Sequence, residues 1–219
     1  MFDYEHFKVK DQNSKLAGQA LERRNAELRN IAQALPMDEL IRRTGISVDR
    51  TTHPGGGFKL ELFGRPLSVK FPALVAFDGN GTELPVFNQS LLLHYFVTAN
   101  GAALAGRWVT FADLPDGRMY AQAFQGYSGD QVAKSFGLNL PEFHSACKKA
   151  RGKPCGIADS SYSFLGLPRI PLLVSYWLGD DEFPSTCKVL FDSSACNYLP
   201  IDGCAIIGSM LVRNILNPK

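Results

Sequence analysis

The chain has 219 residues, of which 45% are hydrophobic and 20% are charged. Its 23 lysines and arginines nearly balance 21 aspartates and glutamates, which gives a net charge of +2 at pH 7. This balance argues against a dedicated nucleic-acid binder, because such proteins usually carry a basic excess on one face. The hydrophobic fraction excludes disorder as the main state and is large enough to build a sizeable core.

The amino terminus lacks the character of an export signal. It begins MFDYEHFKVK, with Asp3 and Glu5 where a signal peptide carries positive charge. No apolar run approaches the ~20 residues that span a bilayer. The five cysteines are an odd number without the density of a disulfide scaffold. We therefore expect a soluble cytoplasmic protein that keeps its thiols free and contacts neither membrane nor nucleic acid.

The first part of the chain has a helical pattern. From about residue 14 to residue 35, one apolar stripe with helical spacing is formed by Ala17, Leu21, Leu28, Ile31, Ala32 and Leu35. Pro36 suits the first position of a second, short helix, and Gly45 suits its end. We expect residues 14–45 to form a helical amino-terminal arm of a single domain that spans residues 1–219.

After residue 45 the pattern changes to strands. Residues 58–63 and 67–71 alternate between apolar and polar, and residues 64–66 are expected to form the turn of a hairpin. Further strands are expected at 108–111, 161–178 and 188–191, and Asn88 is placed to cap a helix over residues 89–100. Because the strands cluster as hairpins, the predicted fold class is α+β, a mostly antiparallel sheet built from hairpins with helices packed on it.

Two histidines are candidate metal ligands. The chain has no phosphate-binding loop, nucleophile elbow, zinc motif or C-x-x-C pair. His94 lies within the apolar run at 91–96, and His144 shares a helical stripe with Leu140 and Cys147. A neutral imidazole in apolar surroundings can ligate a metal or the central ion of a tetrapyrrole. The competing interpretation is a core histidine that bonds a backbone carbonyl.

Other residues extend the candidate site. Arg169 lies in an apolar, proline-bracketed strand, where its guanidinium needs a carboxylate such as Asp159 or Asp192, or an anionic ligand. The glycine-rich run at 53–57 offers backbone N–H groups for an anion, or forms a plain hairpin loop. The candidate cofactor-binding residues are therefore His94, His144, Arg169, His53, Gly55, Gly56 and Tyr127.

A series of short segments lies between residues 108 and 203: FADLP at 111–115, FQGYSG at 124–129, FG at 136–137, YSF at 162–164, LPRIPL at 167–172, DEFP at 181–184 and LFDSSA at 190–195. In these segments the chain resembles a family with a domain of unknown function from anaerobic bacteria and archaea. Some relatives of this kind resemble fusions to a four-cysteine iron–sulfur module, which implies anaerobic one-carbon or corrinoid metabolism. This chain has no cysteine before Cys147 and no D-x-H-x-x-G cobalamin motif. We therefore expect no iron–sulfur cluster here and another mode for any tetrapyrrole binding.

Three functions remain open. The first is a cofactor- or ligand-binding accessory protein for a corrinoid or haem, whose ring is apolar and whose rim carries carboxylates or amides. The second is a Cys/His-dependent hydrolase or transferase, in which Cys147 or Cys155 meets His94 or His144. The third is a protein that docks on an iron–sulfur or corrinoid partner through its acidic cluster at 180–182 and basic cluster at 148–153. We favour the first, because every standard catalytic signature is absent.

Overall fold

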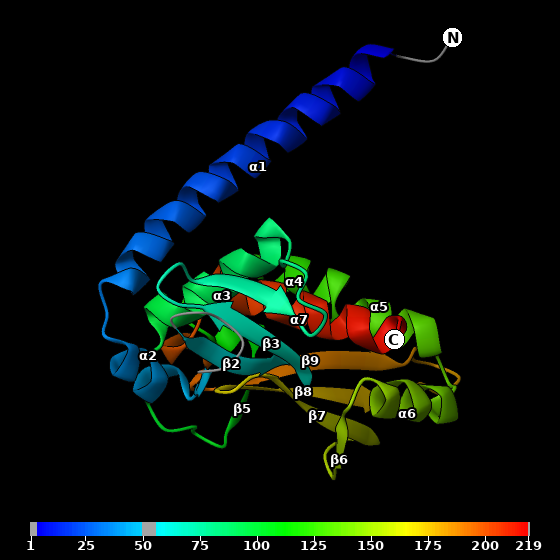
Figure 1. The fold of residues 1–219 in the computed structure, drawn as a ribbon. Coiled ribbons are helices and arrows are strands. Elements are labelled where there is room, and N and C mark those ends of the chain that lie inside the picture. Colours follow the sequence, from blue (N-terminus) through cyan, green and yellow to red (C-terminus); the bar gives the residue numbers. More distant parts are fainter. Residues whose placement is uncertain (1–3, 50–55, 219) are drawn as a thin grey trace.

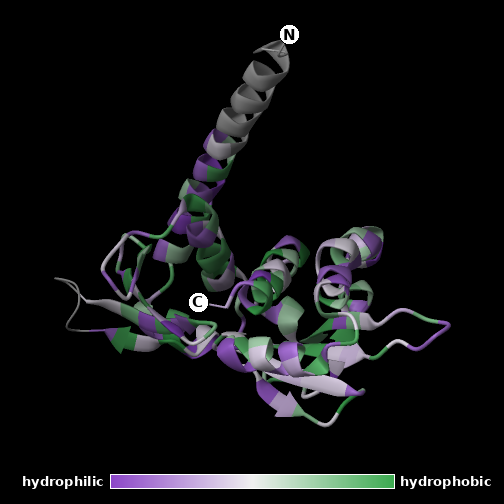
Figure 2. Ribbon diagram, turned by 90° about the vertical axis from the view of Figure 1, so that its right-hand side faces the viewer, coloured by the Kyte–Doolittle hydropathy of each residue, from purple (hydrophilic) through white to green (hydrophobic). Residues whose placement is uncertain are grey.

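The computed structural model describes residues 4–49 and 56–218, the side chains of residues 4–17 excepted (Figure 1). Two antiparallel sheets and the helices packed on them form the body of the molecule. The amino-terminal part of helix α1 (Tyr4–Gln33) projects from this body, whereas its carboxy-terminal part packs on the core. Figure 2 shows the same projection from a second direction. The predicted α+β class is confirmed, because the sheets consist of antiparallel hairpin strands with helices packed against them.

In the described part of the chain, the smaller sheet contains β1 (Ser47–Asp49), β2 (Gly57–Leu62), β3 (Arg65–Lys70) and β4 (Val75–Asp78), in that order. Along β2, Phe58, Leu60 and Leu62 are buried, while Lys59 and Glu61 are exposed. Successive side chains of a strand point to opposite faces. One face of the smaller sheet therefore joins the core, and the other faces outward.

The larger sheet has the order β5-β9-β8-β7-β6 within the residues described. Its strands are β5 (Trp108–Thr110), β6 (Lys153–Cys155), β7 (Ser160–Leu167), β8 (Ile170–Trp177) and β9 (Thr186–Asp192). A bulge interrupts β7 between Leu165 and Leu167. At this bulge the Phe63 N–H donates to the Gly166 carbonyl over 3.0 Å, so a backbone hydrogen bond joins the two sheets.

The remaining helices cover the sheets. They are α2 (Met37–Thr44), α3 (Val86–Thr98), α4 (Ala121–Tyr127), α5 (Gly129–Phe136), α6 (Leu140–Lys149) and α7 (Ile201–Leu216). Helix α5 packs against β9, and α7 lies against α3, α5 and α6. This setting explains why α7 is apolar on most sides. Among the helices described, none combines the length and the hydropathy that crossing a bilayer requires.

Helix α3 lies at the centre of the molecule. Helix α1 packs along it, and the Asn25 side-chain amide donates to the Val86 carbonyl over 3.0 Å. The buried Gln89 amide accepts from the Ala76 N–H over 3.0 Å and donates to the Ala76 carbonyl over 3.1 Å. These bonds attach α3 to β4. The helix therefore connects the amino-terminal arm to the smaller sheet, and one continuous cluster of buried side chains extends from both sheets to the helices.

Candidate functional site

His94 lies on α3 and is half-buried. Burial lowers the pKa of its imidazole, the positive charge of Arg24 lowers it further, and Asp202 acts in the opposite direction. The ring is therefore mainly neutral at pH 7, as a metal ligand must be. However, His94 lines none of four cavities that the described residues form.

His144 already has a protein partner. Its Nε2 lies 2.9 Å from the Ser160 Oγ, and its ring packs near those of Phe143 and Tyr162. This is the environment of a satisfied core histidine, with a hydroxyl in place of the expected carbonyl. Among residues 4–49 and 56–218, no group of three His, Cys, Asp or Glu side chains is placed to hold a metal ion. The structure therefore adds no further protein ligands to either histidine.

Arg169 lies between β7 and β8, and its backbone N–H forms a hydrogen bond with a tyrosine of α3. Its N–H donates to the Tyr95 hydroxyl over 3.1 Å, and that hydroxyl donates to the Thr44 carbonyl over 2.6 Å. Its side chain lies along Gly45, where an added Cβ would come within 2.9 Å of the guanidinium Nε. Gly45 ends α2 with a φ of +70°, the left-handed conformation that favours glycine, and this explains why position 45 lacks a side chain. Arg169 thus joins the larger sheet to α2 and α3.

The two carboxylates suggested as partners for Arg169 are engaged elsewhere. Asp159 accepts from the Leu178 N–H over 2.9 Å, and Asp192 binds the loop that precedes β5. Within the described residues, no carboxylate forms an ion pair with the Arg169 guanidinium. The residue also lines none of the four cavities.

The remaining candidate residues are also dispersed. His53 and Gly55 lie outside the described residues. Gly56 precedes β2 with a φ of +86°, and its carbonyl accepts from the Phe71 N–H over 3.3 Å. Tyr127 ends α4, is exposed, and meets the Phe124 ring edge-on. The described structure therefore does not gather the predicted cofactor-binding residues around one cavity.

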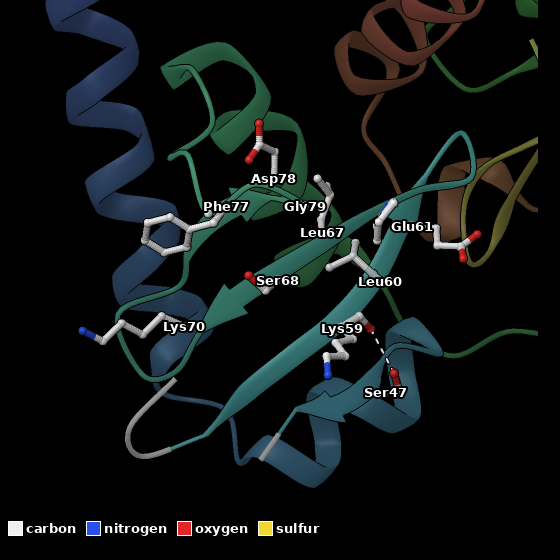
Figure 3. Close-up of a pocket in the computed structure, with 12 residues that line it drawn as sticks. Ser47, Lys59, Leu60, Glu61, Leu67, Ser68, Lys70, Phe77, Asp78 and Gly79 are labelled. Atoms are coloured by element: carbon white, nitrogen blue, oxygen red, sulfur yellow. Dashed lines mark hydrogen bonds between the residues drawn. The ribbon is translucent and has the colours of Figure 1, made fainter. Parts of the chain in front are cut away.

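A different site lies on the outward face of the smaller sheet. We call it the sheet groove: a hollow of about 690 Å³ lined mainly by Ser47, Lys59, Leu60, Leu67, Ser68, Lys70, Phe77 and Asp78 (Figure 3). Ser47, Lys59, Ser68 and Phe77 are direct cross-strand neighbours on the four strands. Because such neighbours share one face, their side chains form a row across the sheet. The volume lies within the usual range of small-molecule sites, roughly 300–1,000 Å³.

Charge is unevenly distributed along the sheet groove. The Lys59 Nζ lies 3.2 Å from the Oδ1 of Asp49, whose side chain is fully buried. Lys70 stands opposite Gly57 at the end of β3, and no carboxylate of the described residues forms an ion pair with it. Figure 3 shows both lysines at the end where β2 begins, while Asp78 and Glu61 lie toward the opposite end. The lysine end therefore favours an anionic group.

The sheet groove was not predicted from the sequence. Alternating lysines in a hairpin are typical of a solvated strand face, and the pattern alone does not distinguish a hollow face from a flat one. The available signal was the glycine-rich run at 53–57, for which the sequence left two interpretations open: backbone N–H groups that bind an anion, or a plain hairpin loop. Gly56 adjoins the lysine end of the sheet groove, because its neighbour Gly57 pairs with Lys70.

The cysteines differ strongly in exposure. Cys147, Cys187 and Cys204 are buried, and Cys155 and Cys196 are half-buried. Burial raises the pKa of the Cys147 and Cys204 thiols to about 12, and it also raises the pKa of Cys187. Because the thiolate is the nucleophile, these three thiols are poorly suited to covalent catalysis at neutral pH.

We expect thiol modification to divide the cysteines into two classes. In folded protein at pH 8, a disulfide reagent should modify Cys155 and Cys196 first, while the buried thiols react only on unfolding. A thiol of pKa about 12 is ionised in about one molecule in ten thousand at this pH. The measurement is the time course of reagent consumption with and without urea. A third rapidly modified thiol in folded protein would contradict the burial described here.

The fold and the site define an α+β domain with an open groove on the outward face of its smaller sheet. The chain belongs to the family described as "Domain of unknown function (DUF3786)", whose model matches residues 36–214. This match takes in α2, both sheets and nearly all of α7. It confirms the resemblance to a family with a domain of unknown function. No match was found among curated proteins or among solved structures.

Proposed function

We propose that this protein is a ligand-binding accessory protein and that the sheet groove is its binding site. The observation that carries this proposal is the pairing of a cationic end, at Lys59 and Lys70, with the half-buried ring of Phe77 in one hollow. Sites for small molecules commonly combine an apolar lining with a few polar groups that fix orientation.

The arrangement indicates the chemistry of the ligand. Lys70 offers three N–H donors to a carboxylate or phosphate, and it has no acidic partner among the described residues. The Phe77 ring favours a flat apolar body. The ligand we propose is therefore an elongated molecule with an apolar body and an anionic group at one end.

A tetrapyrrole is the specific ligand class that we propose. A corrinoid or haem has an apolar macrocycle, and its rim carries carboxylates or amides, so its chemistry matches both parts of the sheet groove. Some relatives of the resembled family resemble fusions to an iron–sulfur module, and the anaerobic one-carbon or corrinoid metabolism that this implies favours the same class. In this arrangement the macrocycle lies on the sheet, and neither His94 nor His144 ligates the central ion, because neither lines the sheet groove.

The alternative of a Cys/His-dependent enzyme has weaker support. Burial raises the pKa of the Cys147 thiol to about 12, and the His144 imidazole beside it is bonded to Ser160. Neither group is poised for nucleophilic attack.

The proposed function is tested by titrating the protein with haemin and with aquocobalamin under anaerobic conditions, following the visible spectrum and the thermal unfolding temperature. We expect one of these probes to bind and to raise the unfolding temperature. Lys70→Met should weaken that binding about tenfold, because a charge-assisted hydrogen bond contributes about 1.4 kcal/mol or more. His94→Ala and His144→Ala should leave the spectrum of the bound probe unchanged.

Lys188→Met is the matched control. Lys188 is an exposed lysine on β9 that lines none of the four cavities, so its loss changes the net charge equally without touching the sheet groove. If neither probe binds, the tetrapyrrole class is wrong. If a probe binds but Lys70→Met and Lys188→Met weaken binding equally, the sheet groove is not the site.

A further inference from the structure

A second hollow lies where the β2–β3 turn meets the larger sheet. We call it the Trp108 cavity; it measures about 450 Å³. Its lining includes three aromatic residues, Trp108 of β5, Phe164 of β7 and Phe63 of the β2–β3 turn, and two cations, Arg151 and Lys153. An aromatic surface beside two cations is the combination that holds a planar ring and an attached anion.

The walls of the Trp108 cavity depend on two glycines. A Cβ at Gly64 would lie 2.8 Å from the Arg151 Cδ, and a Cβ at Gly152 would lie 2.7 Å from the Phe164 ring. Both distances are shorter than side-chain carbons tolerate. The missing side chains therefore let Arg151 lie against the β2–β3 turn and let Phe164 form part of the wall.

Arg151 occupies a backbone conformation that usually belongs to glycine. Its φ is +66°, its N–H donates to the Lys148 carbonyl over 2.9 Å, and the Gly152 N–H donates to the Cys147 carbonyl over 2.8 Å. These two bonds form the motif that closes many helices, with glycine preferred at the position of Arg151. A side chain there costs on the order of 1 kcal/mol. Arg151 nevertheless adopts this conformation, and its guanidinium lies at the Trp108 cavity.

The Arg151 guanidinium is held in place but retains free donors. Its Nη1 donates to the Gly64 carbonyl. A guanidinium has five N–H donors, so others remain for a ligand. Arg151 also lines a small adjoining hollow with Arg65 and Lys149. Four basic side chains therefore surround this region, and Glu61 is the acidic side chain in the described lining.

We propose that the Trp108 cavity binds a planar heterocycle that carries a phosphate group, such as a nucleoside monophosphate. The ring lies against Trp108, and the phosphate lies between Arg151 and Lys153. A phosphate monoester carries nearly two negative charges at pH 7, which matches two cations better than a single carboxylate does. This site borders the sheet groove at Glu61, which lines both hollows, but Trp108, Arg151 and Lys153 line only the Trp108 cavity. Its test therefore does not depend on the proposed function.

The fluorescence of Trp108 provides a direct measurement. The chain has two tryptophans, so Trp177→Phe leaves Trp108 as the sole tryptophan reporter. We expect adenosine monophosphate to quench this fluorescence saturably, because the base stacks on the indole. Adenosine should bind at least tenfold more weakly, and inorganic phosphate should compete with the nucleotide. Calorimetric titration of the unmodified protein repeats the measurement without the Trp177 substitution.

A pair of lysine variants locates the site. Lys153→Met should weaken nucleotide binding about tenfold or more. Lys148→Met should change it less than twofold, because Lys148 belongs to the same basic cluster but lines none of the four cavities. Equal losses in both variants would show a diffuse charge effect and overturn the proposal. Absence of saturable quenching and of calorimetric heat up to millimolar nucleotide would overturn it as well.

Discussion

Gly129→Ala is expected to lower the free energy of unfolding by about 3 kcal/mol or more, the cost of severe overpacking. Gly129 begins α5 where this helix crosses β9, and a Cβ there would lie 2.1 Å from the Cys187 carbonyl oxygen. The obstacle is backbone, which cannot rotate away as a side chain can. Helix α5 is also held at its other end, because the Tyr176 hydroxyl donates to the Gly137 carbonyl over 2.6 Å. Urea unfolding followed by circular dichroism measures the loss.

Gly126→Ala is the matched control for this substitution. Gly126 lies three residues away on α4, and an added Cβ meets no atom within 4 Å. Alanine favours a helix over glycine by about 1 kcal/mol, so the control should be neutral or more stable. If both variants unfold at the same urea concentration, the close approach of α5 to β9 is not present in solution.

Asp192→Asn is expected to destabilise the protein by about 3 kcal/mol. The buried Asp192 carboxylate accepts from the backbone N–H groups of Ala105, Gly106 and Ser194 over 3.0, 2.7 and 2.9 Å, and from the Ser194 hydroxyl over 2.6 Å. An amide has only one acceptor oxygen, so its NH₂ group would face an N–H donor. The loss is measured by urea unfolding at pH 7. Asp181→Asn, at an exposed acid, should change stability by less than about 0.5 kcal/mol.

The pH dependence gives a second test of Asp192. Burial alone would raise the pKa of this carboxyl, but hydrogen bonds from Ser194, Ala105 and Gly106 outweigh it and hold the pKa below its usual value. A lowered folded-state pKa contributes stability above the unfolded pKa, near 3.9, that is lost as the pH falls through the folded value. The free energy of unfolding of the natural protein should therefore exceed that of Asp192→Asn by a smaller amount below pH 4 than at pH 7. If the two free energies of unfolding differ by the same amount at both pH values, the ionised Asp192 carboxylate is not the source of the difference.

Local sequence patterns predicted which helices and strands form better than they predicted the residues at which these elements begin and end. The hairpin was expected to turn at residues 64–66, but the structure turns at Phe63 and Gly64, whose φ angles are 51° and 71°. Positive φ at both positions is the geometry that suits a two-residue hairpin. Pro66 then lies inside β3, and it costs no ladder bond toward β4 because that pairing starts at Leu67.

The first residue of α3 was also predicted less well than the helix itself. Asn88 was expected to cap a helix from residue 89, whereas α3 begins at Val86 after Pro85. Pro85 is the residue that precedes the helix, and its carbonyl accepts from the N–H groups of Asn88 and Gln89 over 2.9 and 3.0 Å, so Asn88 lies within the first turn. The expected cap was wrong, although the helix itself was correctly predicted.

The candidate site depended on tertiary packing that no local pattern contains. Periodicity correctly placed His94 and His144 on helices, but it could not show that Ser160, sixteen residues away from His144, supplies a hydroxyl to it. The row that includes Lys59 and Phe77 exists only because four strands pair in one register. Register between strands is set by the whole core, so the sheet groove became visible only in three dimensions.

The position of α3 limits how the chain can be divided. By sequence this helix belongs to the first hundred residues, yet its Tyr95 holds the Arg169 backbone in the larger sheet and its Gln89 holds β4. A gene fragment encoding only residues 108–219 would leave the Arg169 amide without its acceptor and strip α7 of a neighbour. Recombination that preserves folding must therefore transfer α3 together with the larger sheet, and both lie within residues 36–214 of the family match.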